Sequence, residues 1–173
     1  IGNMISNFLG AVMPEPDYNL SLNYPGDAAV YVLSRISGEG SDRTPEPGDV
    51  KLSATEKRDI LALNEKYEKF MLVINAGGPV DLSGLEDVGN ILVLSQLGVE
   101  TGAALADILL GKQNPSGKLA TTWSAWEDYF PMEDFGDHND TRYREGIYVG
   151  YRYFDAAGKK ALYPFGYGLS FTT

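Results

Sequence analysis

Three short apolar runs mark the predicted strands of this chain. Residues 28–33 (AAVYVL), 70–74 (FMLVI) and 91–94 (ILVL) are continuous in apolar residues and rich in β-branched ones. Runs of this kind, without polar alternation, are typical of strands buried on both faces of a sheet. A fourth, shorter run at residues 119–123 predicts one further strand.

Two helices are predicted between and after these strands. Ser53 and Glu56 have the spacing of a capping box, which marks a helix start. Apolar residues then recur at helical spacing on one face, at Ile60, Leu63 and Tyr67. Residues 99–110 are rich in alanine and leucine and stop at Gly111, a residue that favours the end of a helix.

The order of these elements predicts the α/β class, with a mostly parallel sheet covered by helices on both faces, an α/β sandwich. We expect residues 1–27 to be an irregular lead-in or linker and residues 28–173 to be one domain. The ends of the sequence suggest a single domain excised from a longer protein. Residues 124–143 form a long aromatic and acidic stretch without periodicity, and loops of that length are usually functional or lie against a partner.

Composition excludes several kinds of chemistry. The 173 residues carry 14 basic and 24 acidic side chains, a net charge of −10, so a nucleic-acid partner is not expected. No apolar run approaches the roughly 20 residues that a membrane helix needs, so we expect no membrane partner. The chain has no cysteine and one histidine, His138, which argues against a thiol nucleophile and a histidine-based metal centre. We therefore predict neither a cofactor nor a metal.

The segment at residues 37–43 carries the strongest candidate chemistry. In open α/β sheets, ligands bind outside the carboxyl ends of the strands, and this segment follows the first predicted strand. Glu39 lies between Gly38 and Gly40, so its carboxylic acid would stand on an exposed loop and could serve as a general acid. The alternative is a solvated polar loop with an Asp42–Arg43 pair, and by spacing alone this alternative is the more common. The segments 75–81 and 95–99 follow strands in the same way.

Other suggestive patterns are incomplete. Residues 38–43 begin like a dinucleotide fingerprint, but Arg43 replaces its third glycine, and residues 111–119 lack the magnesium-binding Ser/Thr of a phosphate loop. No Gly-x-Ser-x-Gly element is present, which argues against a serine hydrolase. Aromatic residues between positions 122 and 154 could stack on sugars, although core packing is more common. Tyrosines and arginines at 142–154 favour the rim of a domain interface.

Five segments together resemble glycoside hydrolase family 3, the β-glucosidase-like enzymes. Each is short, but they occur in the family's order across residues 28–173: ISGEGSDR (36–43), NAGGPVD (75–81), NPSGKL (114–119), YREGIYVGYRYF (143–154) and YPFGYGLS (163–170). The resemblance implies the family's α/β sandwich domain, whose partner is a (β/α)8 barrel domain absent from this chain.

The resemblance also implies roles for named residues. Glu39 stands where related enzymes carry the acid/base, so it would be catalytic, and the barrel would supply an aspartate nucleophile. Ser37, Asp42 and Arg43 would contact substrate or shape the site. We expect Arg43 to pair with Asp42 rather than with Glu39, because a contact with Glu39 would oppose retention of its proton.

The implied function is the acid/base-bearing half of a retaining β-glycosidase, most simply a β-glucosidase acting on terminal β-linked sugars. The alternatives are a non-catalytic carbohydrate-binding or scaffold module, or the same chemistry on xylosides or N-acetylglucosaminides. Its partners would be a carbohydrate substrate and the barrel domain, with homo-oligomerisation left open. The isolated chain is expected to be inactive, because a retaining mechanism needs a second carboxylate.

Overall fold

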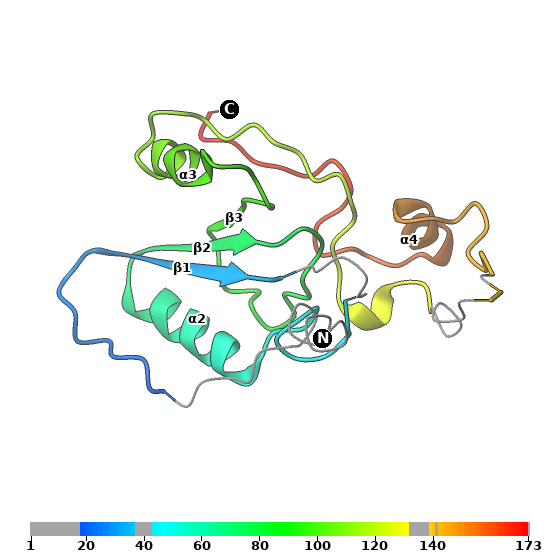
Figure 1. The fold of residues 1–173 in the computed structure, drawn as a ribbon, viewed down its shortest axis with the longest axis horizontal. Helices are drawn as coiled ribbons and strands as arrows, with labels where there is room; N and C mark the ends of the chain where they lie inside the picture. The colour runs from blue at the N-terminus through cyan, green and yellow to red at the C-terminus, as the bar shows by residue number, and fades with distance from the viewer. Residues whose placement is uncertain (1–17, 37–42, 132–138, 141, 173) are drawn as a thin grey trace, which may run out of the picture.

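A three-stranded parallel sheet forms the centre of the computed structural model, which describes residues 18–36, 43–131, 139–140 and 142–172 (Figure 1). The strands are β1 (Ala28–Ser34), β2 (Lys69–Asn75) and β3 (Ile91–Val93), in the order β1-β2-β3. The register pairs Ala28 with Lys69 and continues to the pair Ser34 and Asn75. The three apolar runs are thereby confirmed as strands, and the chain has the predicted α/β fold.

Helix α2 (Ala54–Lys66) crosses between β1 and β2 and packs against both strands. It begins with the predicted capping box: the Ser53 Oγ accepts from the Glu56 N–H at 3.1 Å, and the Ser53 N–H donates to a Glu56 carboxylate oxygen at 2.9 Å. Ile60 is fully buried and Tyr67 is nearly so, which confirms the predicted apolar face. The helix therefore closes one face of the sheet and fixes Glu56 next to the end of β1.

The cap gives a direct stability prediction. Ser53→Ala removes the side-chain oxygen that accepts from the Glu56 N–H at the start of α2, so the free energy of unfolding should fall by about 1 kcal/mol. The measurement is the free energy of unfolding of the purified chain in urea. Ser116→Ala is the matched control, since Ser116 is exposed. If both variants lose the same amount, the capping interaction does not stabilise the fold.

The sheet is buried unequally. Leu72, Val73 and Ile74 of β2 have no exposed surface, as expected of a strand covered on both faces, whereas Val30 and Val32 of β1 are 47% and 50% exposed. The prediction that β1 is buried on both faces is therefore wrong for the described residues. The reason is that these valines alternate with the residues facing α2 and point to the opposite face.

Helix α3 (Thr101–Leu109) confirms the second predicted helix, and Gly111 follows it with a φ of +68°, the left-handed conformation typical of a helix end. In Figure 1, α3 lies beyond β3, on the side of the molecule opposite α2. No residue of α3 is fully buried. Among the described residues, no helix is long and apolar enough to span a bilayer.

The predicted fourth strand at 119–123 is wrong. This segment instead runs antiparallel to residues 163–167, with reciprocal hydrogen bonds between the backbones of Trp123 and Tyr163 at 2.8 and 3.0 Å. Pro164 offers no N–H and Gly166 has a φ of +79°, so a continuous ladder cannot form along the partner segment. The two segments thus pair through a few backbone hydrogen bonds, and residues 119–123 do not form a strand of the sheet.

Two short helices were not predicted. The 3₁₀-helix η1 (Trp126–Asp128) lies within the long aromatic stretch, and α4 (Tyr151–Ala157) follows the positive-φ residue Gly150. Helix α4 projects at one end of the molecule (Figure 1). It is held by Phe154, which is buried, so this part of the predicted interface rim belongs to the chain's own interior.

Candidate functional site

The candidate segment begins at the carboxyl end of β1. Ser37, Glu39 and Asp42 lie outside the described residues, so their predicted roles stay predictions. The residues at both ends of the segment are described, and they include Arg35 and the fourth predicted site residue, Arg43. The site can therefore be built from its two ends.

Arg35 holds the first end. Its backbone N–H donates to the Asn75 carbonyl at 3.0 Å, which continues the β1–β2 ladder by one residue. Its guanidinium is buried and forms a bidentate ion pair with Glu56, with both contacts at 2.7 Å. The Nε donates to the carbonyl of Asp49 at 2.5 Å. A fork-to-fork pair of this kind fixes orientation as well as distance, so helix α2 sets the direction in which the chain leaves β1.

Arg43 holds the second end. Its Nε donates to Asp49 Oδ1 at 2.8 Å, its Nη2 to the Asp49 carbonyl at 3.0 Å and its Nη1 to the Pro79 carbonyl at 2.7 Å. The expected partner Asp42 lies outside the described residues, and the ion pair that the structure shows is with Asp49. All three nitrogens of the guanidinium therefore donate to described acceptors.

The loops after β2 and β3 meet the first loop at these arginines. Pro79, in the loop after β2, contributes its carbonyl to Arg43. The Gln96 side chain donates to the Arg35 carbonyl at 3.1 Å. The loops that follow the three strands are therefore connected through hydrogen bonds among their described residues.

Sequence reasoning missed Asp49, Glu56 as an ion-pair partner, and Arg35. Glu56 was explained by the capping box, and its second role carries no separate sequence signal. Arg35 and Asp49 are polar residues in segments that would ordinarily be solvated. One signal was present: Arg35 lies two positions after the apolar run 28–33, and a charged side chain that becomes buried there needs a partner.

Asp81 links the loop after β2 to η1. Burial alone would raise the pKa of Asp81, but hydrogen bonds from the Ser83 hydroxyl, the Trp126 N–H and the Ser83 N–H outweigh it and hold this pKa below its usual range. Asp81 is therefore ionised at neutral pH. Its two oxygens are occupied by the chain's own donors, so it serves as a structural connection and not as a free acid.

The aromatic stretch divides into a buried and an exposed part. Trp123 and Phe154 are 4% and 3% exposed, and the ring of Tyr129 meets that of Phe154 edge to face at 5.5 Å. These side chains belong to the hydrophobic core, which is the more common of the two uses considered for the aromatic residues. Tyr143 and Tyr148, in contrast, are 83% and 50% exposed and remain available to a partner.

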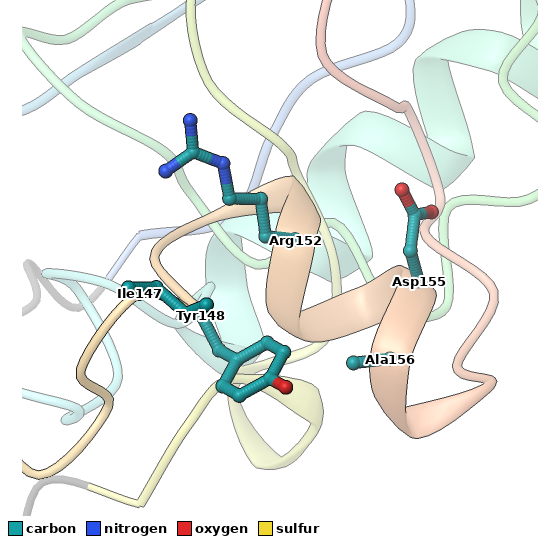
Figure 2. Close-up of a pocket in the computed structure, with 5 residues that line it drawn as sticks. All are labelled: Ile147, Tyr148, Arg152, Asp155 and Ala156. Atoms are coloured by element: carbon teal, nitrogen blue, oxygen red, sulfur yellow. The ribbon is translucent and has the colours of Figure 1, made fainter.

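An open pocket of about 630 Å³ lies beside α4 (Figure 2). Its lining combines two apolar residues, one aromatic ring and two charged side chains: Ile147, Ala156, Tyr148, Arg152 and Asp155. In Figure 2 the two charged side chains extend in different directions from the helix. None of these residues belongs to the three strand-end loops. Among the described residues, no group of three acidic or histidine side chains is arranged to hold a metal ion.

The chain belongs to the family of the glycosyl hydrolase family 3 C-terminal domain, whose sequence profile matches residues 17–171. Among curated relatives, beta-glucosidase A of Butyrivibrio fibrisolvens is 40% identical over 177 residues, and thermostable beta-glucosidase B of Acetivibrio thermocellus is 38% identical over 136 residues. They cover 85% and 78% of this chain, which in turn spans only 21% and 18% of their length.

Solved structures agree with the sequence relatives. Beta-glucosidase 3B of Thermotoga neapolitana, in complex with alpha-D-glucose, is 44% identical with a TM-score of 0.78, over 85% of this chain and 22% of that one. The beta-glucosidase of Kluyveromyces marxianus, in complex with glucose, is 31% identical with a TM-score of 0.74, over 85% and 18%. These relatives confirm the resemblance that the five segments indicated.

Proposed function

We propose that this chain is the acid/base-bearing part of a retaining β-glucosidase. The observation that carries the proposal is the segment with Glu39: its sequence resembles the segment in which related enzymes carry the acid/base, and it connects Arg35 to Arg43 after the carboxyl end of β1. Family membership and the β-glucosidase relatives support glucose as the sugar and β as the configuration of the bond that is cleaved. Glucose as the sugar is favoured over xylose and N-acetylglucosamine because the relatives reported above are β-glucosidases.

In the proposed mechanism, Glu39 acts twice. Its carboxylic acid donates a proton to the glycosidic oxygen as the bond to the anomeric carbon breaks, while an aspartate of the barrel domain attacks that carbon. The resulting Glu39 carboxylate then takes a proton from water, which displaces the aspartate and releases the sugar with its original configuration. Glu39 must therefore be protonated in the free enzyme near neutral pH.

The contacts of Arg43 are compatible with this requirement. A guanidinium that paired with Glu39 would favour its carboxylate and lower its pKa. Among the described residues, Arg43 forms its ion pair with Asp49 and also donates to the Pro79 carbonyl. The alternative function is a purely structural loop.

The rest of the site would come from polypeptide outside this chain. The chain spans 21% and 18% of the two curated relatives reported above. Exposed apolar side chains at Ile147, Val149 and Phe165 are 72%, 52% and 54% accessible and would be covered by a partner. We assign that role to the (β/α)8 barrel domain of the same enzyme.

The test of the function is the stereochemistry and selectivity of the complete polypeptide. We expect it to hydrolyse aryl β-glucosides in preference to β-xylosides and N-acetyl-β-glucosaminides, and to release β-glucose first, as recorded by proton NMR before mutarotation. Initial release of α-glucose would contradict retention. No hydrolysis of any of the three substrates would favour the non-catalytic scaffold module.

A further inference from the structure

Both ends of the segment that contains Glu39 converge on a single residue, Asp49. Arg35 and Arg43 are eight positions apart, and each donates to the Asp49 carbonyl, at 2.5 and 3.0 Å. The Asp49 carboxylate accepts from Arg43 through Oδ1, and through Oδ2 it accepts from the Thr44 N–H at 2.6 Å and the Thr44 hydroxyl at 3.2 Å. The acceptors of Asp49 are thus directed at the two ends of one loop.

Burial and charge strengthen the contacts that Asp49 makes with the two ends of the segment. The side chain of Asp49 is 14% exposed and that of Arg43 is 19% exposed, so water competes weakly for their ion pair. Contacts of this kind are charge-assisted and about twice as strong as neutral hydrogen bonds. Asp49 is in turn connected through Arg35 and Glu56 to the first turn of α2, which packs on the sheet.

We propose that Asp49 is a positioning residue of the catalytic site: by holding Arg35 and Arg43 together, it fixes where the intervening segment places Glu39. This inference rests on the proposed function, because it takes Glu39 as the acid/base. A general acid must lie within hydrogen-bond reach of the glycosidic oxygen, and a misplacement of about 1 Å can cost 100-fold in rate. Asp49 itself touches no reacting atom; its effect passes through Glu39.

The test uses Asp49→Asn in the complete enzyme. Asp87→Asn is the matched control, because Asp87 is exposed and the hydrogen bond that it accepts from the described residue Asn64 is to its backbone carbonyl. Asn keeps the shape and the backbone carbonyl of residue 49 but removes the charge that binds Arg43. We expect kcat/KM for cellobiose, a substrate with a poor leaving group, to fall about 10- to 100-fold. For an aryl glucoside with an acidic phenol, kcat/KM should change less than threefold, since departure of that phenol needs no proton.

A structural role without positioning predicts something different. Loss of folded enzyme would lower kcat for both substrates equally and leave KM and the leaving-group dependence unchanged. The double variant Glu39→Gln/Asp49→Asn should be no slower on cellobiose than Glu39→Gln alone, because Asp49 can act only through a working acid. Arg43→Lys is the second variant if Asp49→Asn does not fold: lysine keeps the charge but cannot reach three acceptors at once, so the same leaving-group pattern is expected.

The outcomes separate this inference from the proposed function. A leaving-group dependence in Glu39→Gln that is absent from Asp49→Asn and Arg43→Lys overturns the positioning role and leaves the acid/base assignment in place. Multiplicative losses in the double variant also overturn it. If Glu39→Gln itself shows no leaving-group dependence, the proposed function fails, and the positioning of Glu39 by Asp49 fails with it.

Discussion

Glu39→Gln in the complete enzyme should reduce kcat/KM for cellobiose by about 100- to 10,000-fold, the usual contribution of general acid–base assistance. Glutamine keeps the size and polarity of the side chain but has no proton to donate to the leaving oxygen. A glucoside with an acidic phenol departs without that proton, so its kcat/KM should be nearly unchanged. Its kcat should still fall, because the second step needs a base to activate water, and the covalent glycosyl-enzyme should accumulate.

Azide provides the discriminating measurement. A small anion needs no deprotonation before it attacks the glycosyl-enzyme, so azide should restore turnover of the acidic phenyl glucoside and yield β-glucosyl azide. Glu65→Gln is the control, because Glu65 is exposed on α2 and the same chemical change there should alter neither substrate's kinetics. Equal losses on good and poor substrates, without azide rescue, would show that Glu39 is not the acid/base.

The fold could be predicted from the sequence wherever a local pattern decides the structure. The continuous apolar runs became β1, β2 and β3, and the capping box at Ser53 set the start of α2 to the residue. These signals depend on interactions within one or two turns or on simple burial. The same logic failed at residues 119–123, because their partner at 163–167 is distant in sequence and interrupted by Pro164.

The sequence predicts a candidate segment after the first strand, but it does not predict the contacts that the structure shows at the two ends of that segment. Gly-flanked Glu39 after an apolar strand indicates chemistry at the carboxyl end of that strand, and the resemblance implies its role. The pairing of Arg43 with Asp49, however, is a choice among several acidic residues nearby in the chain, including Asp42 and Glu46. Burial and loop geometry determine which of these acidic residues pairs with Arg43, and the spacing of residues along the sequence predicts neither.

The convergence of Arg35 and Arg43 on Asp49 shows why contacts that spacing does not predict matter for the proposed function. Each residue, taken alone, has an ordinary explanation: a charge at the end of a strand, or a charge in a solvated loop. Only the distances to Asp49 show that they share one acceptor. A sequence comparison of residue types would therefore identify Glu39 and overlook the residue proposed to position it.

The isolated chain should have no measurable β-glucosidase activity. A retaining mechanism needs a nucleophilic carboxylate about 5–5.5 Å from the acid/base, and the family resemblance places that nucleophile in the barrel domain. Loss of covalent catalysis, together with the sugar-binding half of the site, removes essentially the whole rate enhancement. The measurement is release of nitrophenol from an aryl β-glucoside by the purified chain, compared with the buffer rate and with the complete enzyme.

Two controls make a negative result informative. Cooperative urea unfolding, followed by the fluorescence of the buried Trp123, would establish that the inactive chain is folded. The remainder of the enzyme, produced separately, should then be added with cellobiose as the substrate. We expect it to restore turnover with the wild-type chain but not with the Glu39→Gln chain. Turnover by the chain alone, well above the buffer rate, would overturn the split site and mean that a second carboxylate within it, such as Asp42 or the exposed Glu46, completes the chemistry.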